Sequence, residues 1–141
     1  MKILVGYDGS DNSKRALGRA IELSNGMNAE LIIVLHVDVQ AFETFAAKRL
    51  LAEWRNKMID DAERLVADAA LAAGRDGVKN VRTVVLEGAD PSDAILSVAE
   101  ANIADLIVVG RRGLGSVERF LIGSVSSRLV DHAKCDVLVV K

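Results

Sequence analysis

Five short apolar runs rich in Val, Ile and Leu alternate along this chain of 141 residues with four longer segments of helical character. Most of the runs are continuously apolar, which is typical of parallel strands that are covered on both faces. Alternating strands and helices predict βαβ units, and therefore an open, twisted parallel sheet of five strands with helices on both faces. The expected strands are Ile3–Val5, Leu31–Val37, Val81–Leu86, Leu106–Val109 and Val137–Val140.

Helix end signals support four helices between these strands. Small and apolar residues lie near one face of the first segment, and the Asn-Gly pair at its end predicts a C-cap. In the third segment, DPSDAI supplies Asp90 as the N-cap and Pro91 at the first helical position. The expected helices are about Asn12–Asn25, roughly Phe42–Ala73 before Gly74, a third helix after Asp90, and a fourth from near Gly123 to about Ala133.

The order of these elements predicts where a ligand would bind. No proline-rich linker, low-complexity segment or internal repeat interrupts them, so one domain is predicted over residues 1–141. In open parallel sheets, ligands bind beyond the carboxyl ends of the strands, where the strand order reverses. The first and fourth strands are followed by the glycine-rich sequences GYDGSD and GRRGLGS. If both belong to one site, these two strands are neighbours, which predicts the strand order 3-2-1-4-5.

Charge and composition argue against several classes of protein. A net charge of −2, a pI of about 5.7 and the lack of a dense Lys/Arg tract argue against a nucleic-acid partner. Apolar runs such as Leu31–Leu35 are too short to span a bilayer, and the strand-like start MKILVGYDGS leaves no room for a signal peptide. The single cysteine, Cys135, excludes an intramolecular disulfide. We therefore expect a cytoplasmic protein without a membrane partner.

The stretch GRRGLGSVERFLIGSV, residues 110–125, combines four glycines with three arginines. It is not a Walker loop, because no G-x-x-x-x-G-K-[ST] sequence occurs in it. It is not the dinucleotide pattern G-x-G-x-x-G either, because Glu118 stands where the last glycine is required. Neither common phosphate motif therefore explains this stretch.

The stretch nevertheless offers groups that hold an anion. Gly110 and Gly113 lack a Cβ atom, so their N–H groups can approach an oxyanion closely. At Gly123 and Ser124 the expected helix start adds unpaired N–H groups and the positive end of the helix dipole. Three arginines raise the local positive potential: Arg111, Arg112 and Arg119.

The spacing G-x2-G-x9-G-S, between a strand and a helix, resembles the phosphate- and ribose-binding motif of the universal stress protein family, in its ATP-binding branch. The resemblance extends to YDGSD after the first strand, LHV in the second strand and the C-terminal CDVLVVK. It implies a Rossmann-like fold of the adenine nucleotide alpha hydrolase type, with ATP as the ligand and any Mg²⁺ or Mn²⁺ held by its phosphates. It also implies a homodimer through the C-terminal strand Asp136–Val140, an apolar edge strand that invites pairing.

The resemblance also implies roles for individual residues. Asp8 matches the acidic residue that binds a ribose hydroxyl, and Gly6 and Tyr7 beside it border the base. Val37 matches the residue whose main chain reads the adenine edge, and Gly110 lies against the ribose. The implied phosphate site comprises Gly113, Gly123 and Ser124, with Val125 next in the helix and with Arg111 and Arg112 either contacting phosphate or facing solvent.

Several of these features also have a purely structural interpretation. The Gly-Ser pair can be only a helix start, and the DGSD turn can supply Ser10 or Asp11 as the N-cap of the first helix. His36 is expected to be a hydrogen-bonded structural histidine, and Cys135 a small buried side chain. No metal site built from protein side chains is predicted.

A sparse apolar stripe lies near the start of the second expected helix. It consists of Phe42, Phe45, Trp54 and Met58. Core packing is the expected role of these side chains, with a flap or a partner surface as the alternative.

These observations favour an ATP-binding regulator of the stress response, because the sequence supplies anion-holding groups but no evident base or water-positioning residue. A slow ATPase or self-phosphorylating protein is the second hypothesis, with hydroxyls at Ser116, Ser124 and Ser126 near the expected phosphates. A nucleotide-free dimeric interaction protein is the third. A phosphoacceptor receiver domain ranks low, because it needs an aspartate at the end of the third strand, where this chain has Glu87.

Overall fold

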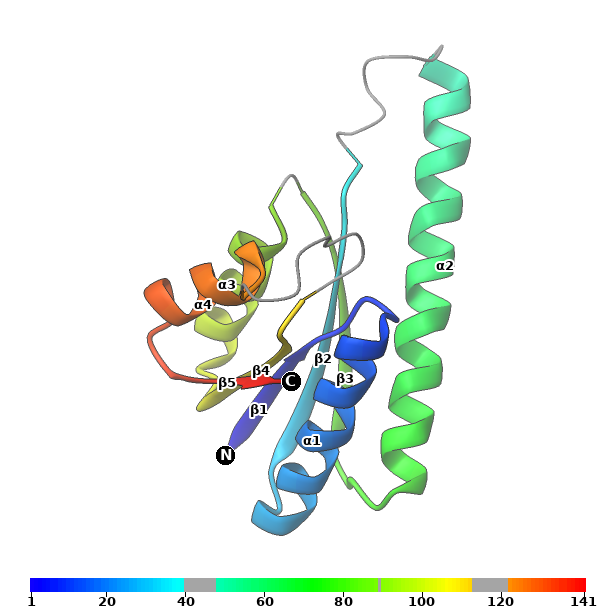
Figure 1. The fold of residues 1–141 in the computed structure, drawn as a ribbon. Helices are drawn as coiled ribbons and strands as arrows, with labels where there is room; N and C mark the ends of the chain where they lie inside the picture. Colours follow the sequence, from blue (N-terminus) through cyan, green and yellow to red (C-terminus); the bar gives the residue numbers. More distant parts are fainter. Residues whose placement is uncertain (40–47, 89, 113–121) are drawn as a thin grey trace.

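The computed structural model describes residues 1–39, 48–88, 90–112 and 122–141. Within this part of the chain, five parallel strands form one sheet in the order β3-β2-β1-β4-β5 (Figure 1), which confirms the predicted topology. In the ladders on either side of β1, Val5 lies opposite Ile33 of β2 and Val108 of β4. The strands are β1 Lys2–Gly6, β2 Glu30–Val37, β3 Val81–Glu87, β4 Leu106–Gly110 and β5 Asp136–Val140.

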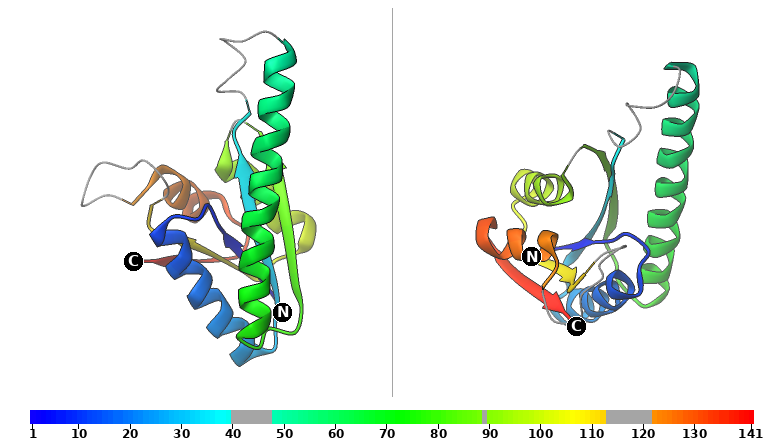
Figure 2. Two further views of the ribbon diagram at one scale, coloured as in Figure 1. Left: turned by 90° about the vertical axis from the view of Figure 1, so that its right-hand side faces the viewer. Right: turned by 45° about the horizontal axis from the view of Figure 1, so that its top comes forward.

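Helices cover both faces of this sheet, as the continuously apolar strands predict. In Figures 1 and 2, α1 and α2 lie against one face, and α3 and α4 lie against the other. The helices are α1 Asp11–Met27, α2 Lys48–Arg75, α3 Pro91–Asn102 and α4 Ser124–His132.

Alternate residues of the central strands build two cores. In β1, Ile3 and Val5 belong to the cluster under α1 and α2, whereas Leu4 belongs to the cluster under α3 and α4. In β2, Ile32 and Val34 join Leu4 on the α3/α4 side. Even-numbered residues near the carboxyl ends of β1 and β2 therefore face α3 and α4.

Two helices continue past the glycines at which the sequence predicts that they end. Helix α1 continues past Gly26 to Met27, and its C-cap is Asn28, whose φ of 50° lies in the left-handed region. Helix α2 likewise runs through Gly74 to Arg75. For α1 the reason is that Asn28 adopts the left-handed conformation that the sequence predicts for glycine. The N-cap predictions were better: Ser10 caps α1 and Asp90 caps α3.

Helix α2 extends well beyond the sheet at its N-terminal end (Figures 1 and 2). Trp54, on this projecting part, is 56% exposed, so the core packing predicted for it is wrong. Met58, one turn further on, does pack against the core under α1 and α2. Phe42 and Phe45 lie outside the described residues. None of the helices in the described ranges is long and apolar enough to cross a membrane.

Candidate functional site

A cleft of about 610 Å³ opens at the carboxyl ends of β2, β1 and β4, on the face covered by α3 and α4. This is the edge at which the strand order reverses, because the chain leaves β1 toward β2 and later returns to β4 on its other side. The volume lies within the range of small-molecule sites. Eight of the predicted site residues line the cleft: Gly6, Tyr7, Asp8, Gly110, Arg112, Gly123, Ser124 and Val125.

The turn after β1 presents Asp8 to the cleft. The N–H of Ser10 donates to Asp8 Oδ1 at 2.9 Å, and the N–H of Asp8 donates to Ser13 Oγ at 3.3 Å. Ser10 in turn caps α1, because its Oγ accepts from the N–H of Ser13 at 3.2 Å. The carboxylate is therefore held by local bonds at the floor of the cleft, where it can accept further hydrogen bonds from hydroxyl groups.

Gly6 and Tyr7 shape the floor in different ways. A Cβ atom on Gly6 would lie 3.1 Å from side-chain carbons of Ile95 and Val109, so glycine keeps open the space between these two walls. The N–H of Tyr7 donates to the carbonyl of Val34 at 2.8 Å, and the Tyr7 side chain belongs to the core under α1 and α2. Burial, with smaller contributions from nearby carboxylates, raises the pKa of the Tyr7 hydroxyl, which therefore stays protonated.

Gly110, at the end of β4, is required by the packing of α1. A Cβ atom at this position would lie 2.7–2.8 Å from the backbone C and O and the Cβ of Asn12, in the first turn of α1. Real side chains do not tolerate such a distance, so any larger residue would push α1 away from β4. The first glycine of the motif thus has a role in the fold as well as a position in the cleft.

The main chain of Arg111 ties the end of β4 to its neighbours. Its N–H donates to the carbonyl of Val140 at 2.8 Å, and its carbonyl accepts from the N–H of Gly123 at 2.9 Å. Ser126 Oγ also lies 3.0 Å from this carbonyl and 3.1 Å from that of Gly123. These contacts fix the start of α4 at the mouth of the cleft.

The N-terminus of α4 is the anion-holding feature of the cleft. Gly123 is its N-cap, with no side-chain hydrogen bond to the first turn, whereas α1 and α3 are capped by Ser10 and Asp90. Ser124, Val125 and Ser126, the first three residues of this helix, all line the cleft. Their N–H groups precede the intrahelical ladder and lie at the positive end of the helix dipole, which favours an anion.

Three predicted site residues are not among those that line the cleft. Gly113 lies outside the described residues, as does Arg119. The Val37 side chain is buried in the core under α1 and α2, and its carbonyl accepts from the N–H of Gly88 at 3.2 Å. Arg111 contributes the main-chain contacts described above. The ligand roles assigned to these three residues, like those of the eight that line the cleft, stay predictions.

The cleft also has lining residues that the sequence analysis did not assign to it. They come from the end of β2, the start of α3 and the first turn of α1: Val34, His36, Asp38, Pro91, Ile95 and Ser13. The signal that could have identified three of them is the period of two in a strand, which puts residues 34, 36 and 38 on the face that carries Leu4 and Gly6.

His36 has the structural partner that was predicted for it. Its Nε2 lies 2.7 Å from the carbonyl oxygen of Gly88, in the connection from β3 to α3. The ring nevertheless also lines the cleft, which the sequence did not indicate. Cys135 is half-buried rather than buried, and burial together with two nearby carboxylates raises the pKa of its thiol.

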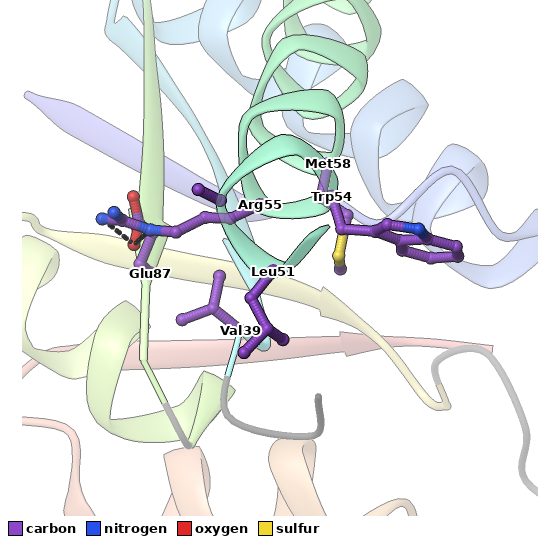
Figure 3. Close-up of a pocket in the computed structure, with 7 residues that line it drawn as sticks. Val39, Leu51, Trp54, Arg55, Met58 and Glu87 are labelled. Atoms are coloured by element: carbon purple, nitrogen blue, oxygen red, sulfur yellow. Dashed lines mark hydrogen bonds and ion pairs between the residues drawn. The ribbon is translucent and has the colours of Figure 1, made fainter. Parts of the chain in front are cut away.

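A second pocket, of about 320 Å³, lies between the projecting part of α2 and the ends of β2 and β3 (Figure 3). Figure 3 shows the apolar side chains of Val39 and Leu51 between Met58 on one side and the ion pair of Arg55 and Glu87 on the other; the Nη2 and Oε2 atoms of this pair are 2.6 Å apart. None of the predicted site residues lines this pocket. Across the described residues, no group of three or more His, Cys, Asp or Glu side chains is arranged to hold a metal ion.

This geometry defines a class: an open parallel α/β protein with a ligand-sized cleft at the point where its strand order reverses. The family model for the universal stress protein family matches residues 1–141. A Staphylococcus aureus (strain USA300) protein named as a universal stress protein is 37% identical over 139 residues, which are 99% of this chain and 82% of that protein. The chain therefore belongs to the universal stress protein family.

Solved structures agree with this assignment. The universal stress protein UspA from Lactobacillus plantarum superposes with a TM-score of 0.90 at 30% identity, covering 100% of this chain and 97% of that one. A universal stress protein crystallised in complex with cAMP superposes with a TM-score of 0.76 at 31% identity, again covering 100% and 97% of the two chains. The five-stranded topology derived from the sequence is thus that of the family.

Proposed function

We propose that this protein binds ATP in the cleft at the ends of β2, β1 and β4, and that it acts as a homodimeric, nucleotide-dependent regulator of the stress response. The observation that carries the proposal is the start of α4, whose N-cap offers no side chain to its own first turn. Its N–H groups share one cleft with the carboxylate of Asp8. One cleft thus combines donors for phosphate with an acceptor for ribose hydroxyls.

The strand order supports one direction for a nucleotide in the cleft. Phosphates belong at β4 and α4, where Gly123, Ser124 and Arg112 line the cleft. The ribose belongs in the middle, over Asp8 at the end of β1. The base then lies toward β2 and α3, where Val34, Pro91 and Ile95 supply apolar contacts. The relative that was crystallised with cAMP supports an adenine nucleotide as the ligand.

The regulatory interpretation rests on which hydroxyls the cleft presents. Ser126 is 2% exposed, and its hydroxyl lies within hydrogen-bond distance of the carbonyls of Arg111 and Gly123. Its role in holding the start of α4 disfavours it as a phosphate acceptor. Ser124 is exposed and suits a phosphate contact. Ser116 lies outside the described residues. We therefore favour nucleotide binding over self-phosphorylation, with Mg²⁺ or Mn²⁺ held, when present, by the phosphates.

The dimer proposal rests on β5, which forms one edge of the sheet. Its four apolar residues, 137–140, are all half-buried, and within the described part of the chain no strand pairs with its outer backbone edge. Sedimentation at tens of micromolar, where specific interfaces hold, is expected to give a dimer; a monomer would contradict this part of the proposal. Cytoplasmic location and the absence of a nucleic-acid partner stay predictions.

The test of nucleotide binding combines two measurements. Mass spectrometry of small molecules released from freshly purified, denatured protein is expected to show adenine nucleotide, and calorimetry is expected to show heat on titration with ATP. Asp8→Asn preserves an oxygen that can accept from the N–H of Ser10 but removes the charge. Its affinity for ATP is expected to fall by about tenfold or more, as is typical when a charged hydrogen bond is lost. Wild-type protein that releases no adenine nucleotide and also gives no heat with ATP would refute the proposal.

A further inference from the structure

The half-buried imidazole ring of His36 lies among apolar side chains at the end of the cleft proposed for the base. Val34 and His36 of β2 face this end from the strand, and Pro91 and Ile95 of α3 face it from the helix. The ring of His36 is neither deeply buried nor freely exposed. The ring can therefore form a hydrogen bond to a ligand while its contact with the Gly88 carbonyl holds it in place.

The carbonyl of Gly88 fixes the tautomer of this ring. A carbonyl oxygen only accepts hydrogen bonds, so Nε2, which lies 2.7 Å from it, carries the proton. In the neutral ring, Nδ1 is then left with a lone pair and acts only as an acceptor. Exchanging the tautomer would put two acceptors 2.7 Å apart, so the neutral ring does not become a donor at Nδ1. Among the described residues, the bond to Gly88 is the only hydrogen bond that the ring makes.

We propose that His36 selects the purine by reading its position 6, with Nδ1 accepting a hydrogen bond from the amino group of adenine. The same lone pair opposes a 6-oxo group, the acceptor that hypoxanthine and guanine carry, because Nδ1 of this tautomer has no hydrogen to donate. This inference rests on the proposed function, since it requires that a nucleotide occupies the cleft with its base toward β2.

Asp38 is the other polar side chain at this end of the cleft, and it supplies the matched control. Its carboxylate is also an acceptor, but the residue is exposed, one step beyond the end of β2. An exposed carboxylate can instead hydrogen-bond to water or a cation, so it discriminates less between an amino and an oxo group. His36, half-buried and locked by Gly88, is the better discriminator.

The experiment compares ATP, ITP and purine riboside triphosphate by calorimetry on the wild-type protein and on His36→Phe, His36→Leu and Asp38→Asn. These three ligands carry an amino group, an oxo group or hydrogen at position 6, and the oxo ligand also carries a proton on N1, where the other two have a lone pair. The wild-type protein is expected to bind ATP about fivefold tighter than purine riboside triphosphate and about tenfold or more tighter than ITP, as for one lost and one opposed hydrogen bond. Both His36 variants are expected to bind all three ligands with affinities within about threefold, whereas Asp38→Asn keeps the wild-type ATP to ITP ratio.

The outcomes separate this inference from the proposed function. Wild-type protein that binds ATP and ITP equally would overturn the inference and leave nucleotide binding intact. His36 variants that melt like the wild-type protein and keep its preference, or that bind no nucleotide at all, would also overturn it. Loss of the preference in Asp38→Asn alone would transfer the role to that carboxylate and overturn it. Wild-type protein that binds none of the three ligands would refute the proposed function itself.

Discussion

Helices α3 and α4 begin beside the same cleft, yet their first turns are built in opposite ways. Helix α3 begins after Asp90, whose Oδ1 accepts from the N–H groups of Ser92 at 2.7 Å and Asp93 at 3.2 Å. Helix α4 begins after Gly123, which offers its first turn no side-chain acceptor. Among the described residues, one helix start therefore has a side-chain cap and the other does not, as the proposed anion site requires. The difference teaches that a missing cap, in a helix start lining a cleft, is itself an indication of an anion site.

The largest expected effect comes from giving α4 a cap of its own. Gly123→Asp would place a carboxylate where Asp90 stands in α3, at a backbone conformation (φ −63°, ψ 157°) that suits an N-cap. It would both occupy the N–H groups and repel a phosphate, so the affinity for ATP measured by calorimetry is expected to fall by about 100-fold.

Gly123→Ala is the matched control for this change. It adds the same Cβ atom, which lies 3.1 Å from the Arg111 carbonyl oxygen, but no cap. Its affinity for ATP is expected to stay within about fivefold of wild type, less than the cost of one lost hydrogen bond to a charged group. Equal losses of ATP affinity in the two variants would show that the room taken by the added Cβ atom, rather than the uncapped helix start, governs binding.

The second effect is expected from removing the cap that α3 has. Asp90→Ala leaves two N–H groups of α3 without their acceptor and is expected to lower the free energy of unfolding by about 1 kcal/mol. Because this helix start already satisfies itself, the affinity for ATP is expected to change by less than about threefold. Urea unfolding and calorimetry measure the two quantities. A large loss of affinity without a loss of stability would mean that Asp90 contributes to binding directly.

A smaller, pH-dependent effect follows from the same carboxyl group. Hydrogen bonds from the first turn of α3, and the nearby Arg128, hold the pKa of Asp90 below its usual value of 3.8. A lowered pKa in the folded state means that the stabilisation is present above the unfolded value and is lost as the pH falls through the folded one. The difference in unfolding free energy between wild type and Asp90→Ala is therefore expected to shrink as urea titrations move from pH 6 to below about 3.8. A difference that grows on acidification would have the wrong sign.

The smallest effect is expected at Arg128, whose ion pairs join α4 to the start of α3. Its guanidinium lies 3.1 Å from Asp90 Oδ2 and 2.7 Å from Asp93 Oδ1, and its side chain is 45% exposed. Exposed ion pairs contribute little, so Arg128→Ala is expected to cost about 0.5 kcal/mol or less in urea unfolding. A cost as large as that of Asp90→Ala would show that the ion pairs, rather than the backbone hydrogen bonds, stabilise the start of α3.

The sequence was sufficient for the topology because the signals that specify it are local. Continuous apolar runs predict parallel strands, and the two glycine-rich strand ends place β1 beside β4, as observed. Asp90 and Pro91 marked the start of α3 correctly. Gly26 did not mark the end of α1, because a left-handed Asn28 ends that helix instead.

The cleft was predictable only in part, because its walls meet through tertiary packing. The glycine motif and Asp8 predicted the walls of the cleft that β1, β4 and α4 form. The wall formed by β2 and α3 was not predicted, because a continuously apolar strand gives no pattern from which the face of each residue can be assigned. Val34 and His36 could be assigned to the cleft only once Leu4 and Ile32 had fixed the α3/α4 face.

The close approach of Gly110 to Asn12 has a consequence for comparing sequences within this family. Since a Cβ atom at residue 110 would lie 2.7 Å from the backbone of α1, selection for folding alone is enough to preserve this glycine. A relative that no longer binds a ligand is therefore expected to retain glycine at the position of Gly110. At the position of Gly123 it is expected to have acquired Ser or Asp. The residue at the position of Gly123, rather than the number of glycines in the motif, then better distinguishes family members that bind a ligand from members that do not.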